Sequence, residues 1–352
     1  TAVRELNSYG VQPDFIIARS NGAMDEKRKE KLAIWCNVQP ERIISAPDVE
    51  SIYDVPMNLE RDNIGERLLE ALNLPTDAVS DLSEWSDFVS RVKKGGPEVK
   101  IGIVGKYFDT GDFVLSDAYL SVIEALKFSG ALLGVKPQIK WLNAKDFEKG
   151  EAIETLSEYD GIIVPGGFGE TGIEGKIQAA KYCRENKIPY FGLCYGMHMM
   201  VIEYARTVLG LEGAHTVEIN PDSPHPVVDV MPEQKALIAE GKYGGTMRLG
   251  NYLEKIVPGT IAYTAYGKEE VEERHRHRYE INPEYVKQLT DAGLVFSGVS
   301  PDGVLMEIAE LPESVHPFYL GTQAHPELIA RPLAPHPLFS EFLSAAKAKK
   351  GE

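Results

Sequence analysis

Between residues 99 and 210, short apolar runs alternate with longer segments in which apolar residues recur every three or four positions. The apolar runs predict buried strands at 99–107, 137–144, 159–169 and 188–194. The periodic segments predict helices at 116–134, 173–186 and 197–210. Because strands and helices alternate, we expect an α/β fold: a doubly wound, mostly parallel sheet with helices on both faces. In such a sheet the functional groups gather at the carboxyl ends of the strands.

The pattern changes beyond residue 225, where the apolar segments become shorter. Strand-like runs lie at 225–231, 260–267, 271–282, 294–300, 304–311 and 318–327. Two arrangements fit this pattern. The runs could extend the edge of the same sheet, or they could form an antiparallel layer beside it.

The first 75 residues form a smaller block of alternating pattern, with too few predicted strands for a complete sheet. The chain also begins without methionine, inside an amphipathic pattern, so we expect it to be part of a longer protein. A polar stretch at 76–98 predicts a linker with one short helix, whose Trp85 and Phe88 should dock on a neighbouring element. The expected organisation is a partial α/β segment at 1–75, a linker at 76–98 and one large domain at 99–347.

Composition narrows the possible functions. A formal net charge of −16 over 352 residues argues against binding to nucleic acid, which needs a basic face. No apolar run approaches the roughly 18 residues of a membrane span, and no signal-peptide pattern opens the chain, so we expect no membrane partner and a cytoplasmic location. The three cysteines predict free thiols, and their spacing predicts no metal site.

One cysteine stands where a predicted strand turns into a predicted helix, in the stretch Gly192-Leu193-Cys194-Tyr195-Gly196. This pattern fits a nucleophile elbow, in which small neighbours allow a tight turn that exposes the reactive side chain. The unpaired N–H groups at the helix N-terminus would also favour the thiolate. A buried core thiol between two glycines fits the same residues, so other groups must decide.

Two further segments could complete a catalytic site. His325 and Glu327 lie two residues apart, so in an extended segment they project to the same side, as a base and the carboxylate that orients it. The turn at 165–169, Pro-Gly-Gly-Phe-Gly, could supply backbone N–H groups to an oxyanion. Taken alone, the first segment fits a solvated loop histidine better, and the second fits a phosphate-binding turn or a plain tight turn.

In this order and spacing, the motifs resemble class I glutamine amidotransferases, and most closely the CTP synthase family. The stretches that resemble its glutaminase domain lie at 165–169, 172–197, 244–250, 273–282 and 336–342. The stretches that resemble the end of its synthetase domain lie at 10–20, 29–38 and 44–59. The resemblance therefore covers nearly the whole chain.

The resemblance implies roles for individual residues. Cys194 would attack the side-chain amide of glutamine, His325 would transfer the proton, Glu327 would orient His325, and the Gly167 and Tyr195 amides would hold the oxyanion. The residues implied in glutamine binding are Gly167, Tyr195, Gly196, Met197, His198, Glu218 and Arg278. Lys31 and Val49 match nucleotide-binding positions. Lys106, with the loop at 108–117 beside it, matches the junction that couples the two halves.

Three positions depart from the family pattern. Tyr195 and His198 replace a leucine and a glutamine, and we expect both to line the glutamine pocket and to weaken binding. The imidazole of His198 would also make binding depend on pH near its ordinary pKa of roughly 6.5. Thr171 replaces an arginine that the family associates with its response to GTP, so we expect little activation by GTP.

The resemblance implies a glutaminase that supplies ammonia for the ATP- and Mg²⁺-dependent conversion of UTP to CTP in the complete enzyme. It implies no cofactor in the glutaminase domain, GTP as an allosteric activator, and assembly into homotetramers or filaments. Because the phosphate-binding loop and the UTP-binding stretch of the family would precede residue 1, this chain should not make CTP. Two alternatives are an assembly module with a weakened site and a stand-alone γ-glutamyl peptidase. The five retained residues Cys194, His325, Glu327, Glu218 and Arg278 argue against the first, and residues 1–75 argue against the second.

Overall fold

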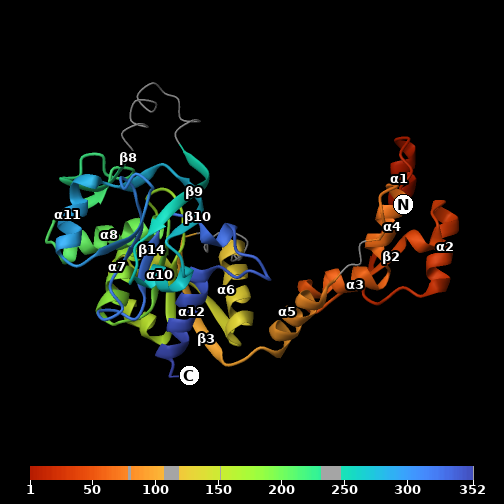
Figure 1. Ribbon diagram of the computed structural model, residues 1–352, viewed down its shortest axis with the longest axis horizontal. Helices are drawn as coiled ribbons and strands as arrows, with labels where there is room; N and C mark the ends of the chain where they lie inside the picture. Colours follow the sequence, from red (N-terminus) through yellow and green to blue (C-terminus); the bar gives the residue numbers. More distant parts are fainter. Residues whose placement is uncertain (78–80, 107–118, 151, 231–246, 352) are drawn as a thin grey trace. The chain divides into compact units, whose positions relative to one another are not determined.

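A computed structural model describes the chain except for residues 78–80, 107–118, 151, 231–246 and 352. The structure divides between Lys93 and Lys94 into two compact units, Thr1–Lys93 and Lys94–Glu352, which are described separately below (Figure 1). None of the helices in the described residues combines the length and the apolar character needed to cross a bilayer.

The first unit contains a two-stranded parallel sheet, β1 (Ile16–Ser20) with β2 (Ile43–Pro47). Its helices are α1 (Ala2–Ser8), α2 (Glu26–Cys36), α3 (Val55–Arg61), α4 (Ile64–Ala71) and α5 (Ser83–Lys94). A small core of Ala33, Val38 and Ile43 joins α2 to β2. Two strands and a small core match the partial α/β segment that the sequence predicts.

The helix predicted within residues 76–98 is α5, and its aromatic residues pack on the first unit. Trp85 Nε1 donates a hydrogen bond of 2.8 Å to the carbonyl oxygen of Tyr53. The rings of Tyr53 and Phe88 meet edge to face, with centroids 5.1 Å apart. The docking expected for Trp85 and Phe88 is therefore confirmed, and nearly all of the helix belongs to the first unit.

The second unit is built on a nine-stranded sheet with the order β10-β9-β12-β13-β14-β6-β5-β3-β4. Its parallel half consists of β3 (Glu98–Gly105), β4 (Lys136–Asn143), β5 (Gly161–Val164), β6 (Tyr190–Leu193) and β14 (Tyr319–Thr322). Numbered along the chain, these five strands lie in the order 2-1-3-4-5, which is a doubly wound arrangement. The expected fold class is confirmed for this half.

The remaining strands realise both arrangements that the sequence left open. An antiparallel extension of the main sheet consists of β9 (Arg248–Ile256), β10 (Glu270–His277), β12 (Val295–Val299) and β13 (Met306–Glu310). A separate three-stranded sheet consists of β7 (Ala214–Thr216), β8 (His225–Val230) and β11 (Tyr279–Ile281). β9 was missed in the sequence, because charged residues, Arg248 and Glu254, occupy buried positions while its leucines are exposed.

Helices cover both faces of the main sheet (Figure 1). α7 (Ile173–Glu185) and α8 (Tyr195–Thr207) pack together on one face, and α6 (Leu120–Leu133) and α12 (Pro337–Lys349) pack together on the other. The shorter helices are α10 (Ile261–Tyr266) and α11 (Pro283–Asp291). The two-sided cover keeps the inner parallel strands β5, β6 and β14 buried, as their continuous apolar sequences require.

The strand-like run at 260–267 is a helix, α10, so that expectation was wrong. Thr260 caps the helix, because its side chain accepts from the Tyr263 N–H at 3.1 Å. The buried Glu310 carboxylate accepts from the N–H groups of Ile261 and Ala262 at 2.6 and 3.0 Å. The Glu310 carboxylate lies outside the run, and together with the Thr260 cap it outweighs the β propensity of the run's threonines and tyrosines.

The buried carboxylate of Glu203 connects α8 to both α7 and β14. Arg184 on α7 donates to Glu203 at 2.7 Å, and the Tyr319 hydroxyl on β14 donates at 3.3 Å. We predict that Arg184→Met lowers the free energy of unfolding by about 3–5 kcal/mol, because it leaves a buried charge without its partner. The double variant Arg184→Met/Glu203→Met should recover most of that loss. Urea unfolding, with hydrogen exchange in α8 as the local measurement, checks this, and equal losses in both variants would contradict it.

Candidate active site

Cys194 sits at the sharp turn between β6 and α8. Its backbone angles, φ 49° and ψ −99°, lie in a region that non-glycine residues rarely adopt and that costs about 1–3 kcal/mol. The turn is tight enough that a Cβ at Gly196 would lie 2.0 Å from the carbonyl oxygen of Val164. The elbow predicted from the sequence therefore forms, and the residue held in the strained conformation is the candidate nucleophile.

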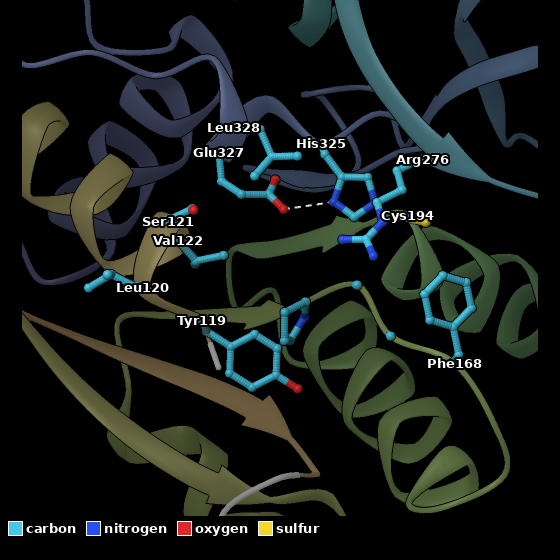
Figure 2. Close-up of a pocket in the computed structure, with 13 residues that line it drawn as sticks. Tyr119, Leu120, Ser121, Val122, Phe168, Cys194, Arg276, His325, Glu327 and Leu328 are labelled. Carbon is cyan, nitrogen blue, oxygen red and sulfur yellow. Dashed lines mark hydrogen bonds and ion pairs between the residues drawn. The ribbon is translucent and has the colours of Figure 1, made fainter. Parts of the chain in front are cut away.

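His325 and Glu327 reach the elbow from the end of the neighbouring strand, β14. The Cys194 N–H donates to the carbonyl oxygen of Thr322, the last residue of β14, at 2.7 Å. His325 Nδ1 lies 2.7 Å from Glu327 Oε1, the contact drawn as a dashed line in Figure 2. Because Glu327 Oε1 accepts a hydrogen bond from the Nδ1–H group, Nε2 of the imidazole remains available for proton transfer.

The charges in this group favour an imidazolium and thiolate pair. Burial alone would lower the pKa of His325, but the Cys194 thiolate and the Glu327 carboxylate outweigh it and raise that pKa to about 11. His325 is therefore protonated across the neutral range whenever Cys194 is ionised. Papain-like cysteine proteases use the same combination of charges in their catalytic pair.

The glycine-rich turn lies directly beside the histidine and the cysteine. A Cβ at Gly166 would lie 2.8 Å from His325 Cε1 and 3.7 Å from the Cys194 Cβ, so only glycine fits there. Gly167 lines the same cavity. Tyr195 is the first residue of α8, where the backbone N–H has no acceptor within the helix. Both predicted oxyanion donors, Gly167 and Tyr195, thus belong to segments that meet at Cys194.

A cavity of about 280 Å³ opens onto the catalytic group. It is lined by Tyr119, Leu120, Ser121, Val122, Pro165, Gly166, Gly167, Phe168, Cys194, Arg276, His325, Glu327 and Leu328. Figure 2 shows the Arg276 guanidinium and the Phe168 ring in this cavity. Arg276 was missed, although the alternation of β10 pointed to it: Arg274 and Arg276 face outward while His275 and His277 are buried.

The predicted glutamine-binding residues fall into two groups, and the first lies around the glycine-rich turn. Glu218 follows β7, and its Oε1 accepts from the Gly169 N–H at 3.0 Å. Burial raises the pKa of Glu218, while Gly169 and the charges of Lys106 and Arg278 act in the opposite direction. The Tyr195 hydroxyl donates to the carbonyl oxygen of Gly169 at 3.0 Å. Glu218, Lys106, Arg278 and Tyr195 are therefore gathered at one side of the turn.

The second group faces the protein interior. Met197 is fully buried in the main core, and His198 is 2% exposed, with Nε2 2.8 Å from Gln323 Oε1. The expected titration of His198 near pH 6.5 was wrong, because burial lowers its pKa to about 4. Neither side chain lines the described cavity, so their contribution to glutamine binding must come through the backbone or through a neighbour.

The residues predicted to bind nucleotides belong to the first unit. Lys31 is exposed on α2, and Val49 is half-buried just after β2. The structure does not bring these two residues into a described cavity. The loop at 108–117 expected to act with Lys106 lies outside the described residues.

Behind the catalytic group, the antiparallel strands bury a cluster of ionisable side chains. Glu254, His275 and Glu307 are the group of described residues whose spacing could hold a metal ion. Arg248 Nη1 already lies 2.6 Å from Glu307 Oε1, and His275 Nε2 lies 2.9 Å from Glu254 Oε1. Arg248 therefore supplies a fixed positive charge to this cluster of buried carboxylates.

Two family models match the chain. The model described as "Glutamine amidotransferase class-I" matches residues 114–345, and the model described as "CTP synthase N-terminus" matches residues 1–74. The CTP synthase of Caldanaerobacter subterraneus is 50% identical over 98% of this chain and 62% of its own length. The CTP synthase of Methanocaldococcus jannaschii is 49% identical over 99% of this chain and 64% of its own length.

Among solved structures, the chain is similar to the glutaminase domain of Trypanosoma brucei CTPS with bound acivicin. The identity is 36% and the TM-score 0.65, and the match covers 71% of this chain and 94% of that domain. The chain spans about three fifths of the length of the curated relatives that it matches.

The geometry predicts that the three thiols react very differently with iodoacetamide. Cys194 should be alkylated fastest, because it lines the cavity beside the His325 imidazolium. Cys183 is fully buried, and burial raises the pKa of its thiol, so it should react only after unfolding. Peptide mapping after timed labelling checks this, with Cys183→Ala as the control. Faster labelling of Cys36 than of Cys194 would contradict the assignment.

Proposed function

The chain belongs to the class-I glutamine amidotransferase family and to its CTP synthase branch, and we propose that its second unit hydrolyses L-glutamine with Cys194 as the nucleophile. The observation that carries the proposal is the meeting of Cys194, His325 and Glu327 in one cavity beside the Gly166–Gly167 turn. A thiolate, a proton carrier, an orienting carboxylate and backbone donors are the groups that acyl transfer requires.

In the proposed reaction, the Cys194 thiolate attacks the side-chain amide carbon of glutamine, and the carbonyl oxygen becomes an oxyanion near Gly167 and Tyr195. His325 gives its proton to the departing nitrogen, so ammonia leaves and a thioester forms. His325 then takes a proton from water, which attacks the thioester and releases glutamate and the thiolate. Glu327 holds the imidazole in one orientation through both steps.

The electrostatics fit this sequence of proton transfers. The negative charge of Cys194 is a main cause of the raised pKa of His325, and that charge disappears when the sulfur is acylated. Burial continues to lower the pKa of His325, so the imidazolium becomes a stronger acid when the leaving nitrogen needs a proton. The imidazole is then neutral and able to act as the base for water.

Glutamine would be held by Glu218 and Arg278, with Gly167, Tyr195, Gly196, Met197 and His198 shaping the site. Glu218 offers a carboxylate to the α-amino group of glutamine, and Arg278 offers a guanidinium to its α-carboxylate. The cavity also contains Arg276, which adds a second positive charge for an anionic group. We propose Lys106 as a positioning residue, because it lies between Glu218 and the glycine-rich turn.

In the longer protein we propose that the released ammonia serves the ATP-dependent amination of UTP to CTP, with Lys31 and Val49 at the nucleotide sites. We further propose that this protein is a cytoplasmic homo-oligomer, a tetramer that can form filaments, and that GTP is a weak activator because Thr171 replaces an arginine. The cluster of Glu254, His275 and Glu307 lies in the second unit beside Arg248. Because Mg²⁺ prefers oxygen ligands, this cluster with its histidine is not suited to the Mg²⁺ that accompanies ATP.

We predict that the chain releases glutamate from glutamine slowly, because catalytic contacts tighten only when partner sites close on them. Cys194→Ser and His325→Ala should each reduce the rate at least about a hundredfold. Cys183→Ser, a substitution in the core, is the matched control and should keep the rate. Supplying ammonia, UTP, ATP and magnesium should yield no CTP.

An enzyme-coupled glutamate assay with and without nucleotides tests these statements together. Glutamate release that survives Cys194→Ser would overturn the proposed nucleophile. A large rise in rate with GTP would overturn the expectation that Thr171 leaves this chain unresponsive.

A further inference from the structure

We propose that Gln323 is a catalytic residue whose side-chain amide donates a hydrogen bond to the Cys194 thiolate, and that His198 holds this amide in the productive orientation. The inference rests on the proposed glutaminase function and adds to it a second group that contacts the nucleophile. It also gives His198 a role different from the one expected from the sequence.

Gln323 contacts the sulfur of Cys194 and does not line the described cavity. It follows β14 directly and precedes His325 by two residues. Gln323 Nε2 donates to Cys194 Sγ at 3.7 Å, within the range for a sulfur acceptor, and Gln323 is fully buried. The backbone N–H of Gln323 donates to the carbonyl oxygen of Glu307 at 2.7 Å, which fixes its main chain.

The orientation of the amide decides whether it supports or opposes the thiolate. A carboxamide has a donor end and an acceptor end, and a thiolate accepts but cannot donate. If the amide turned over, its oxygen would face the negatively charged sulfur in a site without water to separate them. Something must therefore hold the oxygen away from Cys194.

His198, the fourth residue of α8, holds the amide oxygen away from the sulfur. Its Nε2 lies 2.8 Å from Gln323 Oε1, and with the amide oxygen on this side the imidazole donates its Nε2 proton to that oxygen. The hydrogen bonds then run in one direction, from His198 Nε2 to Gln323 Oε1 and from Gln323 Nε2 to Cys194 Sγ. Since His198 and Gln323 are both almost completely buried, water does not compete for these bonds.

The contribution of His198 is geometric rather than ionic. Burial lowers the pKa of its imidazole to about 4, so the ring is neutral at neutral pH. The other titratable groups that act on this region are His325 and Glu280, which interact with the Cys194 charge, and His277, which lies near His198. None of these groups is altered by substitution at 198 or 323, so they remain a constant background in the experiment.

The experiment measures the rate of Cys194 alkylation by iodoacetamide against pH, in the full chain, for four variants. Gln323→Met removes the donor at similar side-chain length, and His198→Phe removes the group that orients it. His198→Gln keeps a donor at position 198. His316→Phe is the matched control, since His316 is equally buried but bonds the carbonyl oxygen of Cys183 at 3.0 Å.

A hydrogen bond to a charged group is commonly worth a factor of about ten to a hundred in equilibrium. We therefore expect the thiolate titration of Gln323→Met and His198→Phe to move up by about one pH unit or more, with kcat for glutamine reduced and KM little changed. His198→Gln and His316→Phe should keep the original titration. Circular dichroism confirms that each variant is folded, and either of the first two variants suffices for the test.

An unchanged alkylation profile in folded Gln323→Met or folded His198→Phe would overturn the inference. A shift in His316→Phe as large as in these variants would also overturn it, because the effect would then come from core disruption in general. Failure of the proposed function looks different: glutamate release would survive Cys194→Ser, whatever the alkylation profiles show.

Discussion

The parallel pairing of β6 with β14 is the constraint on which the active site depends. Leu193 at the end of β6 pairs with Thr322 at the end of β14, and the Cys194 N–H continues this pairing onto the carbonyl oxygen of Thr322. The elbow and the His325 loop are far apart in the sequence, and this register places them side by side. A shift of one residue would turn His325 and Gln323 away from the sulfur. The β5–β6 pairing likewise brings the glycine-rich turn alongside, since Val164 pairs with Gly192.

Around the sulfur, the sheet separates two kinds of environment. On the cavity side, Arg276 and the glycine-rich turn offer positive charge and backbone donors to a substrate. On the interior side, the buried side chains of Gln323 and His198 bond each other, and the Gln323 backbone N–H bonds the carbonyl oxygen of Glu307, which pairs with Arg248. The strained backbone at Cys194 keeps the side chain between these two regions. The turn at the end of β6 therefore places the Cys194 side chain in contact with the buried Gln323 and also at the cavity.

The sequence was most informative where a function requires local backbone geometry. The Gly192–Gly196 elbow, the glycine-rich turn and the His325/Glu327 pair each depend on residues close together in the chain, so all three could be located in advance. The contact between the His198 side chain and Gln323 could not be predicted in the same way. Helical periodicity separates buried from exposed positions, but it does not say which neighbour a buried side chain contacts. The antiparallel half of the sheet was equally uncertain, since pairing among β9, β10, β12 and β13 depends on distant partners. The helix α10 was misread because its capping carboxylate, Glu310, comes from another strand.

The central claim is that Cys194 forms a covalent intermediate with the side-chain acyl group of glutamine while His325 transfers the protons. The most direct measurement mixes the chain with glutamine labelled in its carbon skeleton, quenches with acid within the first turnover, and maps the label on peptides. The account predicts acid-stable label on the Cys194 peptide, little of it in His325→Asn, where the departing nitrogen is no longer protonated, and none in Cys194→Ser. Label on another cysteine, or glutamate formed in the first turnover without label on Cys194, would contradict it.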